Sequence, residues 1–226
     1  MKKRISMILV GSLLLASFND VKADLLKEQR DKLESFTSED SIMNNTTGKE
    51  FVKPVKLPQY YQSDARWGSK RYGISNMKIS GCVPTSLSMV LSVLKEDVTP
   101  VQVADYIYNT STEMNTMFVG TSSDGAAAAI EHWGCNYRVI NSKDDLKVAL
   151  KSGNIVFGSV GHGLFVKGNG THAIILSGYQ NGKVHAIDPD NQEKTNKWYS
   201  IDEIWSQRSM APEDNSVGGP FMVISK

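Results

Sequence analysis

The order in which two hydrophobic patterns occur constrains the fold of this chain more than any other feature of the sequence. Four segments with helical character come first, over residues 84–94, 98–109, 122–134 and 141–153. Short β-branched runs follow over residues 154–160, 171–179, 183–189 and 220–226, interrupted by one short helix over 200–207. This order predicts an α+β fold in which an N-terminal helical half packs on a C-terminal antiparallel sheet.

The first residues have the form of a secretory signal peptide. Three bases at positions 2–4 precede an apolar run over 5–18, and the small residue Ala23 closes the segment. The run is too short to span a bilayer and is typical of a segment that is removed on export. We therefore expect residues 1–23 to be a signal peptide and the protein to be secreted or extracytoplasmic, with no membrane attachment after cleavage.

The rest of the chain divides at about residue 50. Residues 24–50 hold seven acids, four bases and few large apolar side chains, which predicts a solvated spacer or a pro-segment. Residues 51–226 have a globular composition and are long enough for one domain with its own core. The net charge of +1 becomes about −2 without the signal peptide, which gives no support to a nucleic-acid partner.

Two cysteines, Cys82 and Cys135, leave more than one interpretation open. An even count in an exported protein raises the expectation of a disulfide between them. Neither the cysteines nor the four histidines have the CxxC or HExxH spacing of a zinc site, so we expect no metal and no cofactor. The environment of Cys82 has to decide between a disulfide, a buried hydrophobe and a reactive thiol.

Cys82 stands where a helix is predicted to begin. Pro84 favours the first helical turn, and apolar side chains then recur on one face. A sulfur at this place lies among backbone N–H groups that have no partner within the helix, which stabilises a thiolate. The thiolate is the nucleophilic form of cysteine, so Cys82 is the candidate nucleophile.

A general base must come from one of four histidines. His132 lies in an alanine-rich helix, where a packed or half-exposed role is the simpler interpretation. His162 lies in a glycine-flanked loop, and the face of His185 depends on the strand register. His172 opens a strand directly after a loop, at a sheet edge that a helix end can approach. His172 is therefore the preferred base.

Asp188 is the candidate for orienting the imidazole, because it ends the strand that follows the strand of His172. A two-residue Asn-Gly turn at 181–182 would place Asp188 opposite Ile175, on the face away from His172. A three-residue loop would place it opposite Ile174, on the face of His172. The hypothesis of a Cys–His–Asp triad thus requires an odd loop or a bulge in this hairpin. Otherwise Asp188 is an ordinary strand-ending residue.

The sequence resembles a known family in three stretches, QYYQSDARWGSKRYG, GCVPTSLSMVL and THAIILSGYQNGKVHAIDP. They resemble the peptidase family thirty-nine-like domains of the papain-type cysteine peptidases, which are relatives of the proteases that remove double-glycine leaders from bacteriocins. The resemblance covers residues 57–224. It implies a papain-like fold with Cys82 as nucleophile, His172 as general base and acid, and Asp188 as the orienting group.

The chain departs from this family pattern at two positions near the nucleophile. Val83 replaces the glycine that usually follows the cysteine, which narrows the approach to the sulfur. Asn76 stands six residues before the cysteine, where papain-like enzymes have the glutamine that donates to the oxyanion. Asn76 is either a shorter oxyanion donor or an ordinary loop residue. Losing one such donor costs roughly 2.7–4 kcal/mol of transition-state stabilisation.

These features predict a secreted cysteine peptidase that acts on a peptide or protein substrate through a thioester acyl-enzyme. One alternative is an amidase or transpeptidase of cell-wall peptides on the same fold. The other is a non-catalytic binding domain that contains a disulfide between Cys82 and Cys135.

Overall fold

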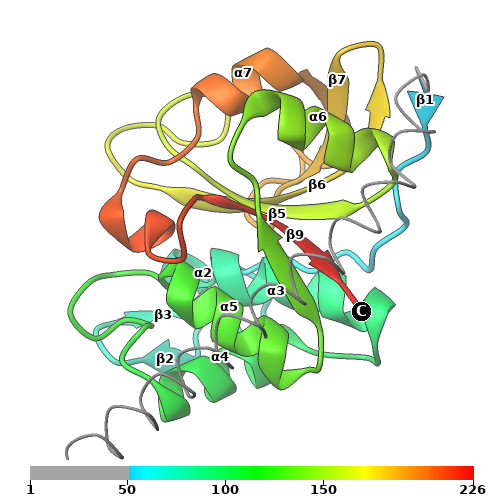
Figure 1. Ribbon diagram of the computed structural model, residues 1–226. Coiled ribbons are helices and arrows are strands. Elements are labelled where there is room, and N and C mark those ends of the chain that lie inside the picture. Colours follow the sequence, from blue (N-terminus) through cyan, green and yellow to red (C-terminus); the bar gives the residue numbers. More distant parts are fainter. Residues whose placement is uncertain (1–50) are drawn as a thin grey trace, which may run out of the picture. The chain divides into compact units, whose positions relative to one another are not determined.

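The computed structural model describes residues 51–226, so the predictions for residues 1–23 and 24–50 lie outside the described part of the chain. Residues 51–226 form three layers (Figure 1). Helices from the first half of this region cover one face of an antiparallel sheet, and two later helices cover the other face. Within residues 51–226, no helix is both long enough and apolar enough to cross a membrane.

The first layer is helical, as the hydrophobic spacing predicts. A short hairpin of β2 (Arg71–Tyr72) and β3 (Ser75–Asn76) leads into α2 (Met77–Ser80), α3 (Cys82–Leu94), α4 (Pro100–Thr110) and α5 (Ser123–His132). Helix α4 begins with a capping box between Thr99 and Gln102 and has Pro100 at its first position. Helices α3, α4 and α5 confirm three predicted segments. The single turn of α2 was not predicted, because four residues are too few to show a helical period.

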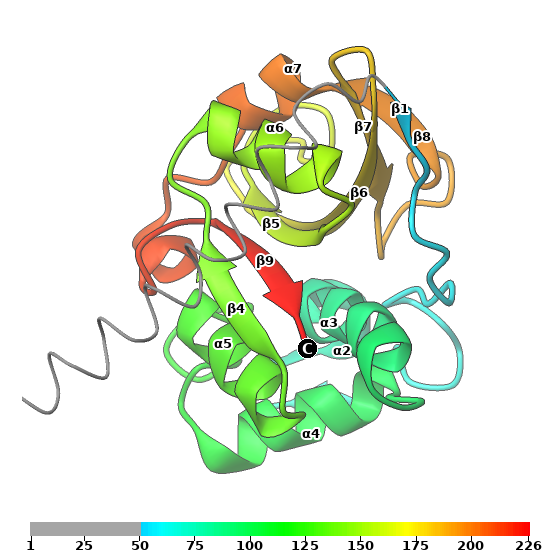
Figure 2. The same ribbon diagram turned by 45° about the vertical axis from the view of Figure 1, so that its right-hand side comes forward.

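The sheet is antiparallel throughout and has the strand order β4-β9-β5-β6-β7-β8. Its strands are β4 (Asn136–Val139), β9 (Phe221–Ser225), β5 (Ile155–Val160), β6 (His172–Gln180), β7 (Lys183–Ile187) and β8 (Lys197–Ser200), and β1 (Phe51–Val52) pairs with the far end of β6. Figure 2 shows β9 lying along β4. The α+β prediction is confirmed, with β1 and β4 joining the sheet from earlier in the chain.

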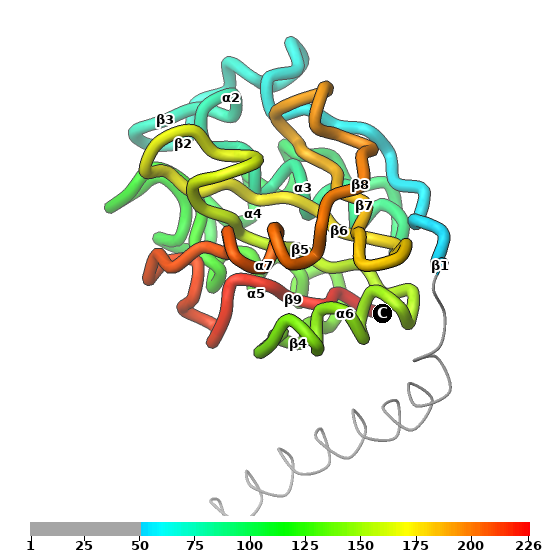
Figure 3. The backbone as a smooth tube through the Cα atoms, turned by 90° about the horizontal axis from the view of Figure 1, so that it is seen from above, coloured from blue at the N-terminus to red at the C-terminus, as the bar shows by residue number. Residues whose placement is uncertain are grey.

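Helices α6 (Lys143–Lys151) and α7 (Ile201–Ser206) form the third layer, as seen from above in Figure 3. Strand β6 is buried on both faces, which explains its nearly continuous apolar run. Ala173 and Ile175 belong to the core beneath α3, whereas Ile174 and Leu176 belong to the core beneath α6 and α7.

The hairpin between β6 and β7 contains the irregularity that the triad hypothesis requires. At the turn, Gln180 pairs with Lys183, which leaves a two-residue Asn-Gly connection. Further along, Ser177 pairs with His185, so Gly178 is an extra residue on β6. Its φ of 72° is in the left-handed region that favours glycine in a bulge. The predicted irregularity is therefore confirmed as a bulge, and the three-residue loop is wrong.

Candidate active site

Cys82 is the first residue of α3, and its side chain is partly exposed. Gly81 before it donates its backbone N–H to the carbonyl of Met77 at 2.8 Å. A Cβ at Gly81 would lie 2.4 Å from that same oxygen, so the close approach of α2 to α3 requires a glycine here. The sulfur is thereby placed at the N-terminal end of a 13-residue helix, as predicted.

His172 is the first residue of β6 and pairs with Val160 of β5. The hydroxyl of Ser86, one turn along α3 from the cysteine, donates to the carbonyl of Ala173 at 3.4 Å. This bond ties the start of the cysteine helix to the strand that carries the imidazole. Cys82 and His172 line one pocket, and Cys82 is one of the groups that raise the pKa of the imidazole.

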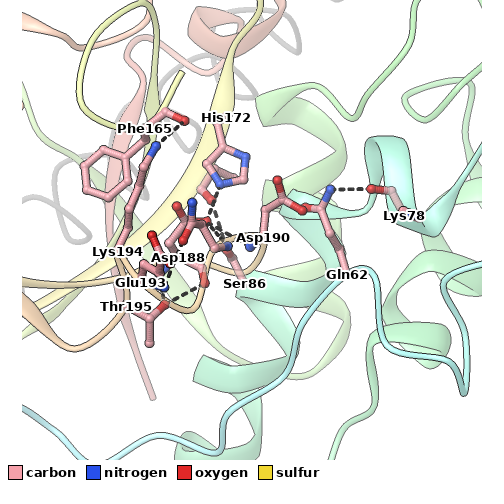
Figure 4. Close-up of polar contacts among 12 residues, drawn as sticks. Gln62, Lys78, Ser86, Phe165, His172, Asp188, Asp190, Glu193, Lys194 and Thr195 are labelled. Atoms are coloured by element: carbon pink, nitrogen blue, oxygen red, sulfur yellow. Dashed lines mark hydrogen bonds and ion pairs between the residues drawn. The ribbon is translucent and has the colours of Figure 1, made fainter. Parts of the chain in front are cut away.

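Asp188 lies just after β7, and 1% of its side chain is exposed. Its Oδ1 accepts a hydrogen bond from His172 Nε2 at 2.7 Å (Figure 4). The same oxygen accepts the backbone N–H groups of Asp190 at 2.8 Å and Asn191 at 3.2 Å, which hold the carboxylate toward the imidazole. Since Nε2 is occupied by Asp188, Nδ1 is the ring nitrogen that remains for the sulfur of Cys82.

The pKa of His172 reflects these contacts. Burial of the ring lowers the pKa, but the hydrogen bonds to Asp188 and to Cys82 outweigh burial and raise it from 6.5 to about 10. The imidazole is therefore cationic at neutral pH, next to the sulfur. A positive charge on this ring favours a thiolate over a neutral thiol.

The pocket at the sulfur has a mixed lining of polar and apolar side chains. Ile79 and Val119 line it and are 65% and 59% exposed. Val83, the residue that departs from the family glycine, also lines the pocket and is 4% exposed. Its side chain packs into the helical core and forms part of the pocket lining.

Asn76 has a structural role, because it caps the short helix that precedes Cys82. Its side-chain oxygen accepts the backbone N–H of Ile79 at 3.1 Å and caps the N-terminus of α2. It is not among the described residues that line the pocket at Cys82. The structure does not bring Asn76 into the group formed by the other three predicted residues, and its oxyanion role stays a prediction.

Two residues that the sequence pattern does not single out hold the site together. Gln62 donates its backbone N–H to the carbonyl of Pro189 and its side-chain Nε2 to the carbonyl of Lys78, both at 2.8 Å. It therefore joins the loop after Asp188 to the segment before the cysteine (Figure 4). The hydroxyl of Thr195 accepts the backbone N–H of Asp188 at 2.8 Å and donates to its carbonyl at 2.7 Å. Both residues lie in segments without a periodic pattern, so nothing local indicates these contacts.

The remaining histidines lie away from the pocket at Cys82. His132 stacks on Tyr106 with 3.9 Å between ring centroids, and His162 bonds the carbonyl of Gly168. His185 is buried in the sheet beside Trp198, and its burial lowers its pKa. In residues 51–226, no group of three His, Cys, Asp or Glu side chains is placed to hold a metal ion.

The two cysteines are both free, so the disulfide considered for Cys82 and Cys135 is not formed. Cys135 follows the C-terminal end of α5 and is 3% exposed, whereas Cys82 opens α3. Burial raises the pKa of the Cys135 thiol, which keeps it protonated. The even cysteine count was misleading because one cysteine is part of the helical core and the other faces a pocket.

Comparison with known proteins identifies the family of this chain. Residues 55–211 match the sequence model of the Peptidase_C39 like family. The chain belongs to this cysteine peptidase family. No curated protein sequence matches the chain.

One solved structure supports the C39-like fold, and two others are similar over much of the chain at lower scores. A protein from Bacillus anthracis described as a C39-like peptidase has a TM-score of 0.56 at 15% identity, over 79% of this chain and 98% of that chain. The peptidase domain of Streptococcus ComA, a bi-functional ABC transporter involved in quorum sensing, has a TM-score of 0.47 at 17% identity, over 64% and 90%. A double glycine motif protease from an AMS/PCAT transporter, solved with the leader peptide, has a TM-score of 0.45 at 15% identity, over 78% and 96%.

Proposed function

We propose that this C39-like protein is a secreted cysteine peptidase that hydrolyses peptide bonds with Cys82, His172 and Asp188. The observation that carries the proposal is the chain of contacts at one pocket. A cysteine at a helix N-terminus meets an imidazole whose other nitrogen lies 2.7 Å from a buried carboxylate. This arrangement supplies a nucleophile, a proton carrier and a group that fixes the ring.

The first half of the proposed reaction forms the acyl-enzyme. The Cys82 thiolate attacks the scissile carbonyl carbon, and the carbonyl electron pair moves onto oxygen. The backbone N–H of Cys82 stabilises that oxyanion. The His172 imidazolium then gives its proton to the leaving nitrogen as the C–N bond breaks, which leaves a thioester on Cys82.

The second half releases the acid product. Neutral His172 takes a proton from water, and the resulting hydroxide attacks the thioester carbonyl. Collapse of this second tetrahedral intermediate expels the Cys82 thiolate and regenerates the ion pair with His172. Asp188 keeps Nε2 occupied throughout, so the ring presents Nδ1 to the sulfur and to the substrate.

The test of this proposal is labelling by a thiol-directed peptidase probe as a function of pH, combined with peptide hydrolysis. The wild-type protein, Cys82→Ala, His172→Ala and Cys135→Ala are compared. We expect Cys135→Ala to label and cleave like the wild type, and both other variants to lose cleavage. Cys82→Ala retains Cys135, so it also measures the labelling of a buried thiol in the same fold.

Two outcomes would contradict the proposal. One is probe labelling of Cys82 that is no faster than that of a free cysteine, whose pKa is about 8.5. The other is hydrolysis that survives in Cys82→Ala. Product analysis with added amine separates a peptidase from a transpeptidase, because only the latter gives mainly the new amide. For export, we expect N-terminal sequencing of the protein from culture medium to begin at Asp24.

A further inference from the structure

A second pocket continues the cleft away from the sulfur. It lies between the loop at Phe118 and the loop at Asn169, and its volume of about 240 Å³ compares with about 60 Å³ for the pocket at Cys82. The two pockets share five residues, which are Val119, Gly120, Thr121, Thr171 and Asp214. They are therefore two parts of one groove, narrow at the nucleophile and wider beyond it.

Asp214 lies where the two parts meet and is 6% exposed. Its Oδ2 accepts the hydroxyl of Ser209 at 2.5 Å, and Ser159 and Thr171 line the pocket at Cys82 together with it. This bond holds the carboxylate at the boundary between the pockets, which Thr171, the residue that precedes His172, also lines. The charged residues that line the wider pocket are Glu213 and Asp214, and both are acids.

We propose that Asp214, assisted by Glu213, is a specificity-determining residue that binds a cationic side chain of the peptide substrate. This inference rests on the proposed function and names a substrate class for the same site. The narrow part of the groove holds the scissile bond at Cys82. The wider part accepts a long side chain, lysine or arginine, whose charged end reaches the two acids.

The physical reason is the environment of the carboxylate. A carboxylate that is largely removed from water interacts more strongly with an approaching cation than one on an open surface. The flexible apolar stem of lysine or arginine packs along Val119 and Phe118, which form one wall of the groove. The charged end then forms a charge-assisted hydrogen bond with Asp214.

The experiment measures kcat/KM for peptide sets in which one position at a time is lysine, norleucine or glutamate. Norleucine has a straight apolar side chain without the charge, so the ratio of lysine to norleucine isolates the electrostatic part. We expect one position at which lysine exceeds norleucine by roughly 10- to 100-fold, with glutamate below both. In Asp214→Asn, the lysine peptide should fall toward the norleucine value while the norleucine peptide changes little.

Asp124→Asn is the matched control, because it removes the same charge from an exposed acid in the first turn of α5. It should leave the ratio of lysine to norleucine unchanged, and an equal loss in this variant would overturn the specific role of Asp214. The wild-type peptide sets test the preference for a cationic side chain even if Asp214→Asn does not fold. If lysine gives no advantage at any position, the inference fails while the proposed function stands. If no peptide is cleaved and the probe does not label Cys82, the proposed function itself fails.

Discussion

Replacing Asp188 by asparagine tests the origin of the His172 charge. The amide keeps a side-chain oxygen for His172 Nε2 and for the two backbone N–H groups, so the geometry of the loop can persist. The negative charge is lost. We therefore expect the pKa of His172 to fall from about 10, because its strongest favourable contact becomes neutral.

The size of this shift follows from the contact itself. A hydrogen bond to a charged group contributes about 1.5–3 kcal/mol, and one pKa unit corresponds to about 1.36 kcal/mol. The loss of the charge should thus lower the pKa of His172 by about one to two units. The alkaline limb of the pH profile of kcat/KM, which reports the protonated imidazole, should move down by the same amount.

The same shift changes the pH dependence of stability. The pKa of His172 in the folded protein lies above its unfolded value of 6.5, so protonation of the ring favours the folded state. This contribution is complete below about pH 6.5 and is lost as the pH rises through about 10. In Asp188→Asn the upper end of this window should move down, which urea unfolding at a series of pH values measures.

The control for this experiment is Asp190→Asn, an exposed acid in the same loop whose backbone N–H bonds to Asp188. It should leave both the alkaline limb and the NMR titration of His172 near their wild-type positions. An Asp188→Asn protein whose His172 titrates as in the wild type would refute the electrostatic explanation of the raised pKa. A shift of equal size in Asp190→Asn would show that loop charge in general, and not Asp188, sets it.

Three further substitutions test other parts of the site. Gly178→Ala should lower the free energy of unfolding, measured in urea, by about 1–2 kcal/mol or more. The reason is that φ at this residue is 72° and the new Cβ would lie 2.8 Å from the nitrogen of Pro54. Unchanged stability would contradict the interpretation of this residue as a bulge that requires glycine. Val83→Gly should lower the free energy of unfolding by about 2–4 kcal/mol, because apolar burial and helix propensity are both lost. It should also raise the relative kcat/KM for peptides with bulky residues at the scissile bond. An unchanged preference would show that Val83 does not limit the access of substrate to Cys82. Asn76→Asp keeps the side-chain oxygen that caps α2 but removes the amide donor. If Asn76 donates to the oxyanion, kcat should fall by about 10²–10³ at unchanged stability. If Asn76 only caps α2, kcat should change little.

Much of the fold follows from local sequence patterns. The segments predicted as α3, α4, α5, α6 and α7 form helices, and those predicted as β5, β6, β7 and β9 form strands. Strands β4 and β8 lie at opposite edges of the sheet and were missed, since each is four residues long and only partly buried. Short segments of that kind acquire their structure from the neighbouring strand rather than from their own periodicity.

The hairpin shows how far sequence reasoning reaches into the site. The Asn-Gly pair predicts a two-residue turn, and that turn is present. The isolated Gly178 within the β6 pattern is itself an indication of a bulge, which the hypothesis demanded but did not locate. One inserted residue reverses the face of every later side chain, so a small local irregularity decides whether Asp188 can meet His172.

The sequence alone determined where each predicted reactive group lies within its own segment. Steric preferences of glycine and proline and the period of the apolar residues place Cys82 at a helix start and His172 at a strand start. Only the tertiary structure decided that these two ends meet, through the bond from Ser86 to Ala173 and the contacts of Gln62 on both sides of the pocket. The physical reason is the separation along the chain between the residues that interact. Local patterns record which face of an element is buried, whereas contacts between segments some 90 residues apart depend on how whole faces pack together.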